Sequence, residues 1–138
     1  MQVAFDGPTG LSLARSFPAD LIILDVMMPG IDGFEVCRRI KNNFNTFFIP
    51  VILITALSAS EHRVRGVKAG ADDFITKPPN PQELVSRINA LARARSFYEA
   101  LEASNNRLRA LLDERSHQLE DATRAMENLL AEQGEPRP

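Results

Sequence analysis

The sequence predicts an α/β fold in which a parallel sheet is flanked by helices and followed by one long α-helix. Residues 21–24 and 50–54 are short, continuously apolar runs, as expected for strands buried on both faces of a parallel sheet. Segments with helical periodicity separate these runs, and such alternation is typical of a parallel sheet covered by helices. From residue 82 to residue 133 the chain has no glycine or proline, so one helix can run through this segment.

The first half of the chain supplies the first elements of this fold. Gln2–Phe5 is expected to form a short strand, and residues 6–10 (Asp-Gly-Pro-Thr-Gly) are of the types that form turns. A helix is expected from residue 11 to about residue 17, and a buried strand over residues 21–24. After a loop, a second helix is expected from about Phe34 to Asn42.

The second half of the predicted sheet follows the same alternation. Residues 50–54 are expected to form a buried strand, and Ser60 to Ala69 a helix. Gly70 is expected to stop this helix, because glycine readily adopts the left-handed conformation that ends helices. Asp73–Thr76 is expected to form a third, shorter strand, which completes a strand–helix repeat.

The long C-terminal segment is predicted to be a helix with a dimerisation seam. Asn80 suits the helix cap, Pro81 the first helical position and Glu83 the third. One heptad frame fits from Leu101 onward, and the predicted seam comprises Leu101, Asn105, Leu108, Leu112, Leu119, Met126 and Leu129. A polar residue such as Asn105 at an a position fixes register in parallel dimers. We therefore predict a homodimeric coiled coil within a helix at 81–133, after a core at 1–80 and before a disordered tail at 134–138.

Composition excludes several classes of protein. The net charge of −2, without a basic block, gives no electrostatic support for a nucleic-acid surface. No apolar run is long enough to span a membrane, and no secretory signal precedes the first element, so a cytoplasmic protein is expected. Cys37 is the single cysteine, so it forms no internal disulfide and is expected to be a small buried hydrophobe.

Three polar residues follow three predicted strands: Asp25, Thr55 and Lys77. The carboxyl ends of parallel strands line one edge of a sheet, and ligands bind there. A carboxylate at this edge can attack phosphorus and form an acyl phosphate. A lysine ammonium and a threonine hydroxyl are donors that a phosphoryl group needs. The sequence therefore predicts a phosphate-handling site; no second catalytic constellation is present, so an enzyme is not expected.

The segments around these residues resemble the response-regulator receiver family. Residues 21–35 (LIILDVMMPGIDGFE) are similar to the run around its phospho-acceptor, and residues 69–78 (AGADDFITKP) to its lysine strand. The resemblance covers about residues 2–93 and implies a flavodoxin-like, CheY-like fold. It implies that Asp25 accepts phosphate from a sensor histidine kinase and that Lys77 and Thr55 contact the phosphoryl oxygens. It also implies that Phe74 is the switch aromatic that moves with Thr55.

The resemblance further implies a Mg²⁺ site and a cis peptide bond. Asp25 and the backbone carbonyl of Met27 correspond to metal ligands of the family, and the bond before Pro78 is expected to be cis. The family's first strand, its acidic pair and its first helix have no counterpart here. The strand at 21–24 is therefore expected at a sheet edge, and the Mg²⁺ site is expected to be incomplete. We predict weak or absent Mg²⁺-dependent phosphorylation, whether the start is trimmed or the receiver degenerate.

Alternative functions remain open at this point. The chain is expected to be either a receiver that relays phosphorylation through dimerisation or a phosphorylation-incompetent remnant that acts as a dimerisation and protein-interaction module. Ser116-His117 is similar to the phosphohistidine box of sensor kinases, but His117 falls at an outward heptad position, which favours a solvated helix face. The segment from Leu101 to Ala131 also resembles helices that join receivers to cyclic-dinucleotide enzymes, which would be one possible output.

Overall fold

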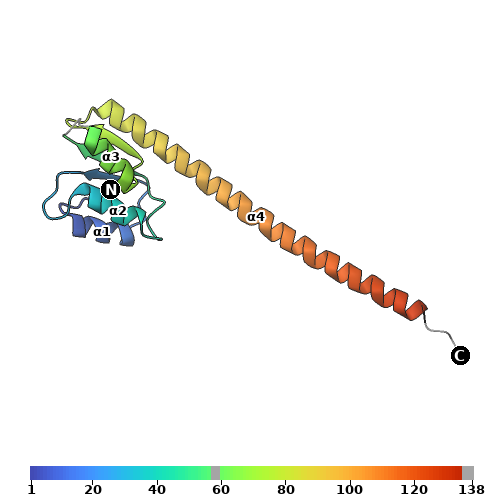
Figure 1. Cartoon of the computed structure of the whole chain (residues 1–138). Coiled ribbons are helices and arrows are strands. Elements are labelled where there is room, and N and C mark those ends of the chain that lie inside the picture. Colours follow the sequence, from blue (N-terminus) through green and yellow to red (C-terminus); the bar gives the residue numbers. More distant parts are fainter. Residues whose placement is uncertain (57–59, 135–138) are drawn as a thin grey trace. The chain divides into compact units, whose positions relative to one another are not determined.

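The computed structural model describes residues 1–56 and 60–134, and Figure 1 shows the order of the elements. The elements are α1 (Gly7–Ser16), β1 (Ile22–Asp25), α2 (Gly33–Lys41), β2 (Val51–Thr55), α3 (Ser60–Ala69), β3 (Asp73–Thr76) and α4 (Pro81–Gln133). Residues 1–96 form one compact unit, and a second unit begins at Phe97 within α4. The predicted disordered tail falls largely on residues 135–138, which lie outside the described residues.

The sheet is parallel, with the order β1-β2-β3 among the described residues. Ile22 of β1 is paired with Val51 of β2, and Leu53 of β2 is paired with Phe74 of β3. The predicted fold class is therefore confirmed. β1 is an end strand of this sheet, as the sequence predicted for residues 21–24.

The chain before β1 differs from the prediction. Asp6 caps α1, because its Oδ1 accepts a hydrogen bond of 2.8 Å from the backbone N–H of Thr9. The predicted turn at 6–10 is therefore wrong, since Gly7 to Gly10 are the first turn of the helix. The predicted strand at Gln2–Phe5 is also wrong, because this segment has no strand assignment. An extended segment needs a neighbouring strand for its backbone hydrogen bonds, and β1 is not paired with it.

Three helices cover one face of the sheet. α1 packs on α2 and α2 packs on α3 (Figure 1). The buried core between these helices and the strands includes Leu24, Phe34, Val36, Ile40, Val51 and Leu53. Cys37 of α2 is fully buried in the same core. Burial raises the pKa of its thiol to about 11, and its Sγ lies 3.5 Å from the carbonyl oxygen of Ala69.

The ends of the helices carry the sequence signals that define them. Asp32 caps α2 through a hydrogen bond of 2.9 Å from the N–H of Glu35 to its Oδ1. Gly70 follows α3 with a positive φ of 84°, which is the left-handed conformation that favours glycine. Asn80 caps α4, because its Oδ1 accepts a hydrogen bond of 2.9 Å from the N–H of Gln82. The helices at 60–69 and 81–133 were predicted with these bounds.

The part of α4 that lies in the second unit is exposed along its described length. Its large apolar side chains, including Leu101, Leu108, Leu112, Leu119, Met126 and Leu129, are half to two-thirds accessible. Within the described residues, no helix combines the length and the apolar character that crossing a bilayer requires. The apolar residues of this segment therefore need another explanation than burial within residues 97–134.

Candidate functional site

Three polar side chains meet at the carboxyl edge of the sheet. Asp25 is the last residue of β1, Thr55 is the last residue of β2, and Lys77 directly follows β3. Because the strands are parallel and in register, their carboxyl ends lie at one edge. The structure thus brings together residues that are separated by as many as 52 positions in the sequence.

The carboxylate of Asp25 has two donors around it. The Nζ of Lys77 donates a hydrogen bond of 2.5 Å to Oδ2 of Asp25, and the backbone N–H of Met27 donates one of 2.8 Å to Oδ1. The side chains of Asp25 and Lys77 are 38% and 37% accessible to solvent. A reactant can therefore reach this carboxylate, which is already oriented by a cation and a backbone amide.

Backbone hydrogen bonds hold these strand ends in place. The N–H of Lys77 donates a hydrogen bond of 2.8 Å to the carbonyl of Thr55, and the N–H of Val26 donates one of 2.9 Å to the carbonyl of Ile54. The Thr55 side chain lies in the buried part of the edge. The peptide bond between Lys77 and Pro78 is cis. The site is therefore built on the ends of paired strands rather than on free loops.

Gly33 supports Asp25 from the other side of the loop, and the sequence analysis did not single it out. Its N–H donates a hydrogen bond of 2.9 Å to the carbonyl of Val26. A Cβ at position 33 would lie 2.3 Å from the carbonyl oxygen of Asp25 and 2.7 Å from the Cα of Val26. Only glycine allows the helix start to approach the Asp25 backbone so closely. The signal in the sequence is the Asp32-Gly33 pair directly before the helical pattern.

Arg65 joins α3 to the same loop and was also missed. Its Nη2 donates a hydrogen bond of 2.8 Å to Oδ2 of Asp32, and its guanidinium lies 4.4 Å from the centre of the Phe34 ring. Asp32 is the cap of α2, so one residue connects α3 to the loop that follows Asp25. No local pattern in the sequence predicts this pair, because 33 positions separate its members.

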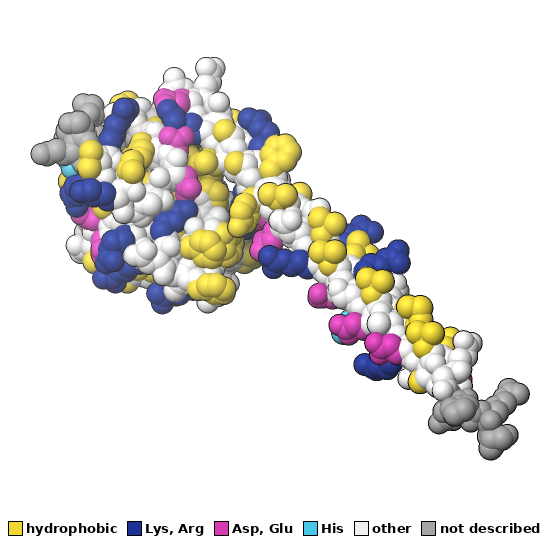
Figure 2. Space-filling model, turned by 45° about the vertical axis from the view of Figure 1, so that its right-hand side comes forward, with side chains coloured by type: hydrophobic (Ala, Val, Ile, Leu, Met, Phe, Trp, Pro, Cys, Tyr) yellow, Lys and Arg dark blue, Asp and Glu magenta, His cyan; other side chains and the backbone are white. Residues whose placement is uncertain are grey.

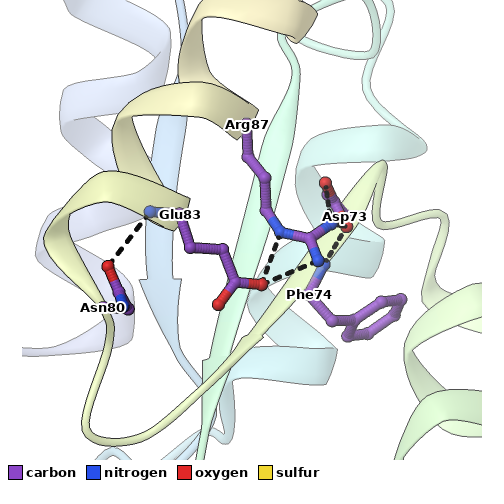
Figure 3. Close-up of polar contacts among 5 residues, drawn as sticks. All are labelled: Asp73, Phe74, Asn80, Glu83 and Arg87. Carbon is purple, nitrogen blue, oxygen red and sulfur yellow. Dashed lines mark hydrogen bonds and ion pairs between the residues drawn. The ribbon is translucent and has the colours of Figure 1, made fainter.

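Phe74 lies on β3 beside α3 and is partly buried against the core. Its N–H donates a hydrogen bond of 2.8 Å to Oδ1 of Asp73. Figure 3 shows Arg87 of α4 reaching both carboxylate oxygens of Asp73, at 2.6 and 2.7 Å, while it also binds Glu83. These hydrogen bonds raise the pKa of Arg87 above its usual range, with Asp73 the larger cause. Phe74, the predicted switch aromatic, therefore lies on a strand that is hydrogen-bonded through Asp73 to Arg87 near the start of α4.

The residues present do not fit a complete Mg²⁺ site. Asp25 and the carbonyl of Met27 are the donors that the sequence analysis offered, and Oδ2 of Asp25 is bound by Lys77. In the described part of the chain, no three side chains of Asp, Glu, His or Cys lie close enough together to hold a metal ion. Mg²⁺ prefers near-ideal octahedral oxygen coordination, and two protein donors leave most of that shell to water.

A hollow of about 700 Å³ lies beside β1 and reaches the site. Residues 1–2, 4–7 and 19–25 line it. Asp25 and Met27 border it, and so do apolar side chains of α1 and α2 such as Leu13 and Val36. The free edge of β1 therefore faces open space directly next to the Asp25 carboxylate.

The other predicted functional residues lie outside this group. The seam residues Leu101 to Leu129 belong to the second unit. His117 is 81% accessible, and its Nδ1 lies 3.9 Å from Oε2 of Glu120. It has the solvated helix position that the heptad frame gives it.

Comparison with known proteins identifies the family to which this chain belongs. Residues 1–89 match the model of the response regulator receiver domain. The response regulator PleD of Caulobacter vibrioides is 45% identical over 111 residues, which are 78% of this chain and 24% of PleD. This chain thus spans about a quarter of the length of that relative. It spans about two fifths of the length of the transcriptional regulator RpaA of Synechocystis and of the response regulator ArlR of Staphylococcus saprophyticus.

Solved structures agree with this match. The receiver domain of the Francisella response regulator 1452 is 40% identical with a TM-score of 0.60, covering 67% of this chain and 75% of that one. The receiver domain of the sensor histidine kinase PA1611 from Pseudomonas aeruginosa is 26% identical with a TM-score of 0.61, covering 66% of this chain and 75% of that one. That domain was solved with a magnesium ion coordinated in its active-site cleft.

Proposed function

Because the chain belongs to the response regulator receiver domain family, we propose that Asp25 accepts a phosphoryl group from a phosphohistidine of a sensor histidine kinase. The observation that carries this proposal is the ion pair between Lys77 and Asp25 at the carboxyl edge of the sheet. Receiver domains act in two-component signalling, and their partners are sensor histidine kinases. The proposed role is thus that of a signalling module and not of an enzyme with its own substrate.

The proposed transfer uses groups that are already in place. A carboxylate oxygen of Asp25 attacks phosphorus, a P–O bond forms, and the P–N bond to the kinase imidazole breaks with its electron pair returning to nitrogen. The product is an acyl phosphate with close to two negative charges. The ammonium of Lys77 moves from the carboxylate to a phosphoryl oxygen, and the hydroxyl of Thr55 donates to another. Phe74 then changes position with Thr55 and alters the surface at α3 and β3.

A bound Mg²⁺ would neutralise developing charge on the phosphoryl oxygens, as the magnesium in the cleft of the Pseudomonas receiver domain suggests. The donors within residues 1–138 are too few for such a site, so no step of the proposal runs through the metal. We expect residues 1–138 on their own to be phosphorylated slowly at best. Lys77 then supplies the main cationic assistance to transfer.

Phosphorylation can be tested with acetyl phosphate and Mg²⁺, followed by intact-protein mass spectrometry. We expect a small, acid-labile or base-labile gain of one phosphoryl mass that is absent in Asp25→Asn. Lys77→Ala is expected to lower the yield further at equal folding. Labelling that persists in Asp25→Asn would remove the proposed acceptor, and rapid Mg²⁺-dependent labelling would contradict the expectation of an incomplete metal site.

We further propose that the signal is relayed through a parallel coiled-coil homodimer of α4. Figure 2 shows apolar side chains along the exposed helix, and the six apolar seam residues are 56–69% accessible. Seven apolar or register-setting residues at a and d spacing need a partner helix to leave water. A second copy of the same helix presents the matching seam, with Asn105 opposite Asn105.

A matched pair of variants, in which aspartate replaces one of two alanines, tests the seam. Ala122 occupies a d position, and Ala110 occupies an outward f position in the same frame. Ala122→Asp is expected to weaken the dimer in sedimentation-velocity experiments, because two carboxylates would be buried together. Ala110→Asp introduces the same charge at a solvated position, and its dimer is expected to remain. Equal sedimentation of both variants would contradict the frame.

A second candidate role is a phosphorylation-incompetent receiver that acts by protein contacts alone. The sparse donor set around Asp25 favours it. In that role, dimerisation is independent of Asp25, and Asp25→Asn leaves every function intact. Phosphate found on His117 instead would support a histidine phosphotransfer role, for which the exposure of that residue gives access.

A further inference from the structure

Three phenylalanines on the loop between α2 and β2 are exposed to water. The side chains of Phe44, Phe47 and Phe48 are 86%, 48% and 47% accessible. Their rings form a row, in which the ring centre of Phe47 lies 6.2 Å from that of Phe44 and 5.7 Å from that of Phe48. With about 200 Å² for each aromatic side chain, this aromatic platform exposes roughly 350 Å² of apolar surface. Apolar patches of that size often mark interaction sites.

The loop that carries the aromatic platform is braced, so it does not fold over to bury the rings. The Nζ of Lys41 donates hydrogen bonds of 3.2 Å to the carbonyl of Phe47 and 2.8 Å to that of Ile49. The buried hydroxyl of Thr46 donates a hydrogen bond of 2.8 Å to the carbonyl of Ile40. A rearrangement that hid the rings would break these bonds and leave buried polar groups unpaired. The rings can therefore leave water only against a second surface.

The aromatic platform lies where α4 ends its contact with the first unit. The guanidinium of Arg95 lies 5.3 Å from the centre of the Phe48 ring, and its Nη1 donates hydrogen bonds of 2.8 and 3.2 Å to the carbonyls of Ala19 and Asp20. After Arg95, every described residue of α4 is exposed. The predicted seam begins six positions later, at Leu101. The platform is therefore next to the segment at which two paired helices would begin.

The aromatic platform is at the edge of the sheet opposite to Asp25. Phe47 and Phe48 precede β2, which begins at Val51, whereas Asp25 is the last residue of β1. Because these strands are parallel, their amino and carboxyl ends lie at opposite edges. A partner on the platform therefore leaves the carboxylate of Asp25 open to a phosphodonor.

The size of the aromatic platform favours a second copy of this chain over an unrelated protein. A stable interface between separate proteins buries about 800 Å² on each partner, and the platform offers less than half of that area. A second copy that is already paired through α4 is present at a high effective concentration, so a small patch is sufficient. In a dimer with two-fold symmetry, a patch beside the axis meets the same patch of the other copy.

We propose that the aromatic platform is a second dimer contact, in which Phe44, Phe47 and Phe48 of one copy pack against the same residues of the other. This inference extends the proposed coiled-coil dimer of α4 and rests on it. Aromatic rings that pack across the axis leave water and gain ring contacts. The platform then holds the first units of the two copies against each other, while the seam holds their helices.

Two phenylalanines of equal exposure provide a matched test. Phe44 and Phe5 are both 86% accessible, but Phe5 precedes α1 and lines the hollow beside β1. The dimer dissociation constant of the full chain is measured by sedimentation equilibrium. Phe44→Glu is expected to raise it about tenfold or more, because two carboxylates would meet in a desolvated contact. Phe5→Glu is expected to leave it unchanged, and equal constants for the two variants would overturn the proposal.

A conservative variant separates loss of apolar contact from damage to the loop. Phe44→Leu keeps an apolar side chain at this position, and its dissociation constant is expected to stay close to that of the wild type. A Phe44→Leu dimer that is as weak as that of Phe44→Glu would contradict an apolar contact. Because the Phe44 side chain is mostly in water, both variants are expected to keep the urea midpoint of the wild type.

Ala122→Asp, which tests the seam, separates this proposal from the proposed coiled coil. If Ala122→Asp weakens the dimer and Phe44→Glu does not, the coiled coil is supported and the platform contact is wrong. If Phe44→Glu weakens the dimer and Ala122→Asp does not, the platform is supported and the seam is wrong. A wild-type chain that stays monomeric at every concentration would overturn both.

Discussion

Replacement by alanine is expected to have opposite effects on stability at Gly33 and at Gly10, because only Gly33 lies against the backbone of Asp25. Gly33→Ala puts a Cβ 2.3 Å from the carbonyl oxygen of Asp25 and 2.9 Å from its carbonyl carbon. Backbone atoms cannot rotate away as a side chain can, so the helix start must move. Gly10→Ala in α1 puts a Cβ 3.7 Å from that of Ala4, which is an ordinary contact.

The magnitudes follow from three contributions. Overpacking costs roughly 1–3 kcal/mol, and loss of the Gly33 to Val26 hydrogen bond costs about 1 kcal/mol. Replacement of glycine by alanine in a helix stabilises by about 0.5–1 kcal/mol, and less at the first residue of α2. Gly33→Ala is therefore expected to lower the free energy of unfolding by roughly 2–3 kcal/mol. Gly10→Ala is expected to raise it by about 0.5–1 kcal/mol.

Urea denaturation can be followed by the amide resonances of β2, which report on the first unit alone. With an m value of about 1–3 kcal/mol/M, the midpoint of Gly33→Ala should fall by about 1 M or more. The midpoint of Gly10→Ala should rise slightly. A Gly33→Ala midpoint equal to or above that of Gly10→Ala would refute the close approach at Asp25. Preserved stability together with an unshifted Asp25 amide resonance would do the same.

Three further outcomes are expected. Thr46→Val should lower the free energy of unfolding by about 1 kcal/mol, because the buried Thr46 hydroxyl donates a hydrogen bond of 2.8 Å to a carbonyl of α2; an unchanged urea midpoint would contradict this. Hydrogen bonds from Arg38 and Arg39 lower the pKa of Glu35 from 4.5 to about 2. The contribution of Glu35 to the stability of the fold is therefore complete above pH 4.5 and is lost as pH falls toward 2. A carboxyl carbon titration by NMR with a midpoint near 4.5 would be inconsistent with those bonds. Cys37 should react with Ellman's reagent at pH 8 much more slowly in the native protein than in urea, because its pKa is about 11 and it is buried; equal rates would contradict its burial.

The sequence predicted those parts of the fold and site that depend on local pattern. Continuous apolar runs identified β1 and β2, and the strand–helix alternation identified the shorter β3. The polar residues at the ends of these strands identified Asp25, Thr55 and Lys77. The segment before β1 was misassigned, because Asp6, Pro8 and Gly10 are residue types of turns, and Asp and Pro are also favoured at the starts of helices. Local chemistry did not distinguish these two uses, whereas the packing of Leu11 into the core did.

The contacts that the sequence did not predict are long-range and depend on close approach. Gly33 and Gly66 matter because their missing Cβ atoms allow close approach. The Asp32-Gly33 pair is a local signal for Gly33, whereas Gly66 has no such signal. The pair of Arg65 and Asp32 joins residues on different elements, and either could equally be a solvated surface charge. Such contacts depend on how the elements pack against one another, and a single sequence does not show this packing directly.

Two connections link the surroundings of Asp25 to α3, and their physical nature decides which one transmits a change. Arg65 and Asp32 are 53% and 43% accessible, and an exposed ion pair contributes only about 0–1 kcal/mol and is screened by salt. The ring of Phe74 packs on Gly66 of α3, where a Cβ would lie 2.1 Å from Cε1 of the ring. This contact is steric, lies against the core, and does not depend on ionic strength. Because the two connections meet at adjacent residues of α3, salt separates them. A structural change of α3 on phosphorylation of Asp25 that persists at 1 M NaCl and disappears in Phe74→Ala would assign transmission to the ring. A change that is abolished by salt would assign transmission to Arg65.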